Sequence, residues 1–108
     1  MISKGYGLQE WTDDRGRSPF AEWVDRLDKT DRGRILTRVA RFQLGNFGDH
    51  KLVRGGVFEA RMDFGPGYRV YFGIEGGALV LLVGGGDKSS QSSDIQLAEA
   101  RWRQHLKK

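Results

Sequence analysis

Five polar side chains whose chemistry suits a phosphodiester fall on two neighbouring predicted strands and on the loop after a third. Glu59 and Arg61 alternate with apolar residues, as do Arg69 and Tyr71, so each pair points to one face of its strand. Lys88 follows the last predicted strand. Because a short turn with glycine and proline joins the first two strands, we expect the five side chains to converge on one face of a sheet.

This set of side chains suits cleavage of an RNA backbone. Two guanidiniums match phosphate oxygens and would stabilise the negative charge that develops in the transition state. The Glu59 carboxylate could accept the proton of a ribose 2′-hydroxyl, which then attacks its own 3′-phosphate, while Lys88 assists the departing 5′-oxygen. The alternative is structural, since opposite charges also pair across the strands of a solvated sheet face. The pattern alone does not decide between the two.

Two helices are predicted in the first half of the chain. Ser18 is a typical N-cap, and Pro19 suits the first helical position. Apolar residues then follow at i, i+3, i+4 and i+7 and share one helical face: Phe20, Trp23, Val24 and Leu27. A second helix is predicted from about Thr30 to the Gly-Asn pair at 45–46, a typical stop signal. Together they form a helical hairpin with one apolar side to bury.

The period of the apolar residues changes from 3.6 to 2 in the second half of the chain. Residues 57–63 and 68–75 alternate, as residues 6–11 do near the N-terminus, and the apolar run 78–83 predicts a central strand. A final helix is predicted to begin around residues 92–94. The order βααβββα predicts a single α+β domain over the whole chain, with the helical hairpin and the C-terminal helix packed on a mainly antiparallel sheet. We expect the polar face of that sheet to stay exposed.

The composition excludes several kinds of site. The 108 residues include no cysteine and 2 histidines, which excludes disulfides, thiolate nucleophiles, cysteine-ligated metals and three-histidine centres. Lys and Arg number 18 against 14 Asp and Glu, and the net charge of +4 makes nucleic acid or an acidic protein a more plausible partner than a membrane. The sequence has no apolar signal core and no membrane-spanning run. We therefore expect a soluble cytoplasmic protein with no metal or other cofactor.

Two further patterns have both a functional and a structural interpretation. Arg34, Arg38 and Arg41 share one side of the second predicted helix, either as a docking surface or as a solvated helix face. The glycine-rich segment 84–89 follows a strand and ends in Lys-Ser, but its glycine spacing does not match a nucleotide-binding loop. We interpret this segment as a flexible loop that lines the site.

Four segments together resemble the RelE/HigB-like addiction-module killer proteins of the RelE/ParE toxin superfamily. They are GNFGDHK at 45–51, FEAR at 58–61, FGPGYRVYF at 64–72 and GGDKSSQ at 85–91. The resemblance covers residues 6–103 with a matching order of elements. GPGYRVYF and GGDKS are its most specific parts.

The resemblance implies a bacterial type II toxin with a RelE-like fold, held inactive by an antitoxin encoded alongside, expected to be a small helix-turn-helix protein. RelE-like members cut mRNA on the ribosome. By similarity, Arg69 matches a phosphate-stabilising arginine, Arg61 a basic position on the preceding strand, and Lys88 the basic residue after the last strand. Glu59 stands where RelE-type toxins place a lysine that serves as base, and a carboxylate can also accept the proton. The C-terminal tyrosine or histidine of some members is missing here.

The polar residues suit metal-independent cleavage of RNA, and the resemblance implies that the chain is a ribosome-dependent mRNA endoribonuclease. Its catalytic residues are predicted to be Glu59, Arg61, Arg69 and Lys88. RNA contacts are predicted for Lys51, Arg54, Tyr68 and Tyr71, and antitoxin contacts for Arg34, Arg38 and Arg41. Two alternatives stay open: a ParE-like inhibitor of DNA gyrase on the same fold, and an antitoxin-binding module with little catalytic activity.

Overall fold

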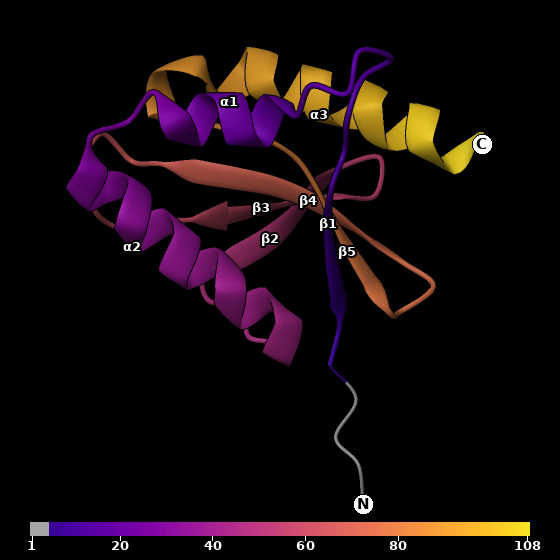
Figure 1. Cartoon of the computed structure of the whole chain (residues 1–108), viewed down its shortest axis with the longest axis horizontal. Helices are drawn as coiled ribbons and strands as arrows, with labels where there is room; N and C mark the ends of the chain where they lie inside the picture. The colour runs from indigo at the N-terminus through magenta and orange to yellow at the C-terminus, as the bar shows by residue number, and fades with distance from the viewer. Residues whose placement is uncertain (1–4) are drawn as a thin grey trace, which may run out of the picture.

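A five-stranded mixed sheet with helices on both faces organises the computed structural model, which describes residues 5–108 (Figure 1). The strands lie in the order β1-β5-β4-β3-β2. In chain order, the elements are β1 (Gly7–Glu10), α1 (Pro19–Asp25), α2 (Lys29–Ala40), the 3₁₀ turn η1 (Arg41–Leu44), β2 (His50–Arg54), β3 (Val57–Arg61), β4 (Arg69–Glu75), β5 (Leu79–Gly86), the 3₁₀ turn η2 (Lys88–Ser90) and α3 (Gln91–Leu106).

The helical hairpin forms as its capping residues predict. The Ser18 side chain accepts a hydrogen bond from the Ala21 amide at 3.0 Å, and Pro19 opens α1. Asp28 caps α2 in the same way, so the helix begins one residue before the predicted start. The chain then tightens into η1 and ends at Gly45, whose φ of 79° a residue with a side chain rarely adopts.

The predicted meander of β3, β4 and β5 is confirmed, and β1 pairs in parallel with β5. The order βααβββα is wrong in one respect, because β2 adds a fourth strand to the meander, antiparallel to β3. This edge strand is largely exposed and so lacks the alternation that marks a half-buried strand. The middle strand of the five is β4, while β5 lies between β4 and β1.

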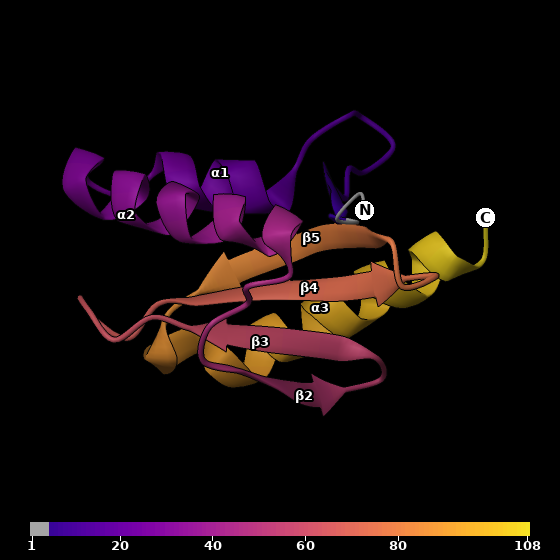
Figure 2. The ribbon, with the colours of Figure 1, turned by 90° about the horizontal axis from the view of Figure 1, so that it is seen from below.

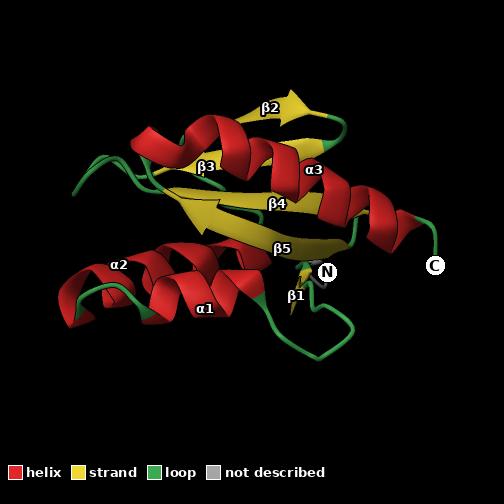
Figure 3. Ribbon diagram, turned by 90° about the horizontal axis from the view of Figure 1, so that it is seen from above, coloured by secondary structure: helices red, strands yellow, loops and turns green. Residues whose placement is uncertain are grey.

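The prediction that one sheet face stays exposed is wrong, since each face carries its own hydrophobic core. One core packs the sheet against α1 and α2, and the other packs it against α3 (Figures 2 and 3). Ala98 and Trp102 of α3 lie on Tyr71, Leu81 and Val83. The face that holds Glu59 and Arg69 therefore lies under a helix. None of the helices in residues 5–108 is long and apolar enough to cross a bilayer.

Candidate functional site

The strand register places three of the four predicted catalytic residues, Glu59, Arg61 and Arg69, in two adjacent rows. Glu59 of β3 lies opposite Tyr71 of β4, and the next row pairs Arg61 with Arg69. Lys51 of β2 lies opposite Glu59 on its other side. Residues directly opposite each other point to the same face of a sheet, so this part of the predicted constellation is assembled as the alternation indicated.

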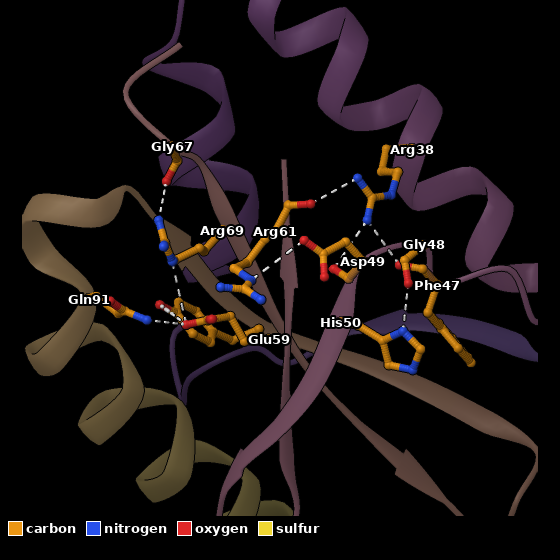
Figure 4. Close-up of polar contacts among 11 residues, drawn as sticks. Arg38, Phe47, Gly48, Asp49, His50, Glu59, Arg61, Gly67, Arg69 and Gln91 are labelled. Atoms are coloured by element: carbon orange, nitrogen blue, oxygen red, sulfur yellow. Dashed lines mark hydrogen bonds and ion pairs between the residues drawn. The ribbon is translucent and has the colours of Figure 1, made fainter. Parts of the chain in front are cut away.

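Glu59 is fully buried and receives its polar contacts at one carboxylate oxygen. Its Oε2 accepts hydrogen bonds from Nε2 of Gln91 at 2.8 Å and from the Tyr71 hydroxyl at 3.3 Å. Nε of Arg69 lies 3.6 Å from the same oxygen, close enough for an ion pair. Oε1 is buried and has no hydrogen-bond partner within residues 5–108. Figure 4 shows this cluster beside the start of α3.

Arg69 is 8% exposed, so the expectation of a solvent-exposed guanidinium is wrong. Its Nη1 donates to the Gly67 carbonyl at 2.6 Å, which turns the guanidinium back over the β3–β4 loop. A Cβ placed on Gly67 would stand 3.2 Å from this nitrogen and 3.5 Å from the Cβ of Lys88. Arg69 and the exposed Lys88 therefore flank the same backbone segment.

Arg61 pairs with Asp49 and not with Glu59. Its Nε lies 3.6 Å from Oδ2 of Asp49, and its side chain is 41% exposed. Figure 4 shows the Arg61 side chain between Arg69 and Asp49, with its marked contact to Asp49. Of the five predicted side chains, three form a buried group: Glu59, Arg69 and Tyr71. Arg61 and Lys88 lie outside this group.

The residues predicted to contact RNA differ in how exposed their side chains are. Lys51 and Arg54 are exposed on β2, and Arg54 is tied to α3 by a 3.0 Å ion pair with Glu99. Tyr71 is fully buried, so it offers no surface to RNA in this structure. Burial and the neighbouring Glu59 carboxylate raise the pKa of Tyr71 well above its usual range, so the phenol stays protonated and can donate to Glu59.

Tyr68 is also buried, in the core under α1 and α2. It is 7% exposed, and its ring packs edge-on against Trp23 and Phe64. Its hydroxyl donates to Oδ2 of Asp31 at 2.7 Å. This hydrogen bond, with burial as a smaller cause, raises the pKa of Tyr68 from 10.0 to about 12.

Tyr68 should make stability depend on pH in the alkaline range. Its phenol binds the proton more tightly in the folded chain than in the unfolded one, so the free energy of unfolding should fall as the pH rises from about 10 to about 12. Tyr68→Phe should flatten this fall, which urea unfolding at several pH values measures. Equal slopes for Tyr68→Phe and wild type would contradict this assignment.

Arg34 and Arg38 of α2 and Arg41 of η1 line one open groove of about 730 Å³ with Lys29, Asp63 and Phe64. Arg38 is mainly structural, since its guanidinium donates to the carbonyls of Arg61 at 3.0 Å and Phe47 at 3.1 Å. The Arg34 guanidinium lies 3.8 Å from the centroid of the Phe64 ring. Arg34 and Arg41 are exposed, so they supply the groove with accessible positive charge.

Two polar residues near the cluster were missed by the sequence reasoning, and both lie at the start of α3. Gln91 donates to Glu59. The Asp94 carboxylate, hydrogen-bonded to the Ser90 hydroxyl, occupies the space that a Cβ on Gly86 would need. Residues 84–86, predicted as part of a flexible loop, instead form the end of β5. A run of glycines inside a strand indicates such a close approach.

Fold and site together define a class: an α+β protein that buries a carboxylate–guanidinium pair between its sheet and its last helix. Within residues 5–108, no three His, Asp or Glu side chains gather as metal ligands.

Comparison with known proteins places the chain in a family. It is 47% identical over 81 residues to an uncharacterized protein of Haemophilus influenzae, a match that covers 74% of this chain and 82% of that protein. The chain therefore belongs to the family of that protein. No protein-family model matches the chain.

Proposed function

We propose that this chain is a RelE/HigB-like toxin of a type II toxin–antitoxin system and that it cleaves mRNA on the ribosome without a metal. The observation that carries the proposal is the pairing of Glu59 with Arg69, next to Lys88. A proton acceptor, a phosphate-binding guanidinium and a second cation thus lie at one end of the sheet. Such a set suits intramolecular attack on a phosphodiester.

The proposed reaction balances with these residues alone. Glu59 accepts the proton of the 2′-hydroxyl, and the 2′-oxygen forms a bond to phosphorus while Arg69 holds the phosphate oxygens. The bond from phosphorus to the 5′-oxygen breaks, and the Lys88 ammonium gives that oxygen a proton. The products are a 2′,3′-cyclic phosphate and a 5′-hydroxyl.

The proposed mechanism requires the RNA to reach Glu59. Its side chain has no exposed surface, so RNA can touch it only if neighbouring groups move. The segment next to Arg69 that offers exposed side chains is η2, a short turn in which Lys88 and Ser89 are exposed. RNA would therefore enter at the Lys88 side, where Arg69 meets the phosphate first.

The enclosure of Glu59 also favours a second candidate, an antitoxin-binding module with little catalytic activity. In that case the pair of Glu59 and Arg69 would only hold α3 to the sheet. A ParE-like inhibitor of DNA gyrase is the remaining alternative, since it needs the fold but no nuclease site.

The order in which cellular processes stop separates these functions. We expect induction of the chain to arrest incorporation of labelled amino acid before that of labelled thymidine, because mRNA is cut first. Arrest of thymidine incorporation first would support the gyrase inhibitor. Full incorporation of both labels in cells that hold the folded chain would support the binding module.

The groove of α2 suits an acidic segment of the antitoxin that the resemblance implies. Four cations and one carboxylate line it: Lys29, Arg34, Arg38, Arg41 and Asp63. Opposite charge across an interface speeds encounter and makes the association rate sensitive to salt.

Arg34→Ala with Arg41→Ala should therefore slow association with the product of the adjacent reading frame and reduce the salt dependence of its rate. Both side chains are exposed, so the folded chain should persist. Stopped-flow mixing at low and high salt measures the effect, with Lys107→Ala, an exposed cation beyond the end of α3, as the control. An unchanged salt dependence would favour an apolar interface instead.

A further inference from the structure

We infer that Gln91 is a positioning residue for the proposed cleavage: it holds Oε2 of Glu59 and so makes Oε1 the oxygen that accepts the 2′-hydroxyl proton. This inference rests on the proposed function and deepens it. It depends on the unequal surroundings of the two carboxylate oxygens.

The two oxygens of Glu59 have opposite environments. Oε2 accepts from Gln91 and from Tyr71 and lies beside Arg69. Its acceptor capacity is therefore largely used. Oε1 is buried without a hydrogen-bond partner among residues 5–108, so its lone pairs are free for an incoming proton.

Gln91 makes the closest of the three contacts. Its Nε2 lies 2.8 Å from Oε2, against 3.3 Å for the Tyr71 hydroxyl and 3.6 Å for Nε of Arg69. Arg69 is also the group that the phosphate engages in the proposed reaction. When the guanidinium turns to the phosphate, the Gln91 amide is the strongest remaining contact of the carboxylate.

The position of Gln91 is fixed independently of Glu59. It opens α3, directly after η2, which Asp87 caps by accepting from the Ser89 amide at 2.8 Å. The body of α3 is anchored on the sheet by the buried Trp102 and by the hydrogen bond from Arg101 to the Val83 carbonyl at 2.8 Å. The Gln91 amide is thus held by a helix that is packed on the sheet.

The hydrogen bond restricts a torsion that is otherwise loose. The last side-chain torsion of a glutamate, between an sp³ and an sp² carbon, has broad and shallow minima. Without the Gln91 donor the carboxylate can turn, and Oε1 is no longer held in one place. A displacement of about 1 Å in a reacting group can cost about 100-fold in rate.

A matched pair of substitutions on one helix tests the inference. Gln91→Met keeps the length of the side chain and removes its donor, whereas Gln96→Met makes the same change at an exposed position of α3. We expect Gln91→Met to lower single-turnover cleavage of ribosome-bound mRNA by roughly 10- to 100-fold with unchanged RNA affinity. Gln96→Met should leave both unchanged, and Gln91→Lys, which restores a donor, should recover part of the rate.

Whether Gln91 acts through Glu59 is tested by making the Gln91→Met substitution in the Glu59→Gln chain. If Gln91 only positions this carboxylate, Gln91→Met should lower the residual rate there no further. An equal loss in both backgrounds would show a general structural role and overturn the inference. Cleavage by Gln91→Met at the wild-type rate would also overturn it. A faster rate would overturn it too, and would show that Gln91 restricts access to Glu59. Absence of cleavage by the wild-type chain would instead overturn the proposed function, and the inference with it.

Discussion

Glu59→Gln is expected to lower single-turnover cleavage of ribosome-bound mRNA by roughly 10²–10⁴-fold, the usual contribution of a positioned base. The amide keeps the shape of the carboxylate but cannot accept the 2′-hydroxyl proton. RNA affinity should persist, because Arg69 and Lys88 supply the contacts to the phosphate in the proposed mechanism. Rapid-quench assays with the variant in excess over mRNA measure the rate without product release.

The control for this substitution is Glu10→Gln, which makes the same change at an exposed position of the edge strand β1. It should cleave at the wild-type rate. Wild-type cleavage by a folded Glu59→Gln chain would mean that the carboxylate only orders Arg69 and Gln91. The base would then lie elsewhere.

Arg69→Ala is expected to lower the free energy of unfolding by about 3 kcal/mol, because it leaves the buried Glu59 carboxylate without its cation. The cost stays at the lower end for a broken buried pair, since Gln91 and Tyr71 still donate to the carboxylate. Urea unfolding of the variant and of wild type measures the difference.

Arg61→Ala is the matched control for stability, since the Arg61 side chain is 41% exposed and pairs with the largely exposed Asp49. It should cost no more than about 1 kcal/mol. In the Glu59→Gln background, the cost of Arg69→Ala should shrink, because no carboxylate is left unpaired. Equal costs for Arg69→Ala in both backgrounds would contradict a buried ion pair.

Because of this stability cost, loss of toxicity in the Arg69→Ala chain would not by itself show that Arg69 acts in cleavage. A chain with Arg69→Ala could lose activity simply by unfolding. Arg69→Lys is the better functional variant, since it keeps the positive charge near Glu59 but loses the planar fork that matches phosphate oxygens. We expect it to fold and to cleave more slowly than wild type.

Most elements of the fold could be predicted, because their signals are local. Ser18 and Pro19 mark the start of α1, and Gly45 marks the end of η1 by adopting a left-handed conformation. The strand β2 could not be predicted, since an exposed edge strand carries no burial pattern. Nor could the face that α3 covers, because its buried residues, Ala98 and Trp102, fit either side of a sheet.

The sequence predicted which residues of the candidate site share one sheet face, but it did not predict their burial or their contacts with α3. Alternation along β3 and β4 places Glu59, Arg61, Arg69 and Tyr71 on one face, as the register shows. Burial of Glu59 and its bond to Gln91 depend on how α3 docks, which joins residues 32 positions apart. The same holds for Arg38, whose bonds to backbone carbonyls make it part of the scaffold.

The chemical ends of the cut RNA test the central claim most directly. Purified chain is mixed with ribosomes programmed with a labelled mRNA, and the termini at each new break are determined. Attack by the 2′-oxygen, with Glu59 as base, predicts a 2′,3′-cyclic phosphate on one fragment and a 5′-hydroxyl on the other. Intact mRNA, or breaks with a 3′-hydroxyl and a 5′-phosphate, would contradict the account.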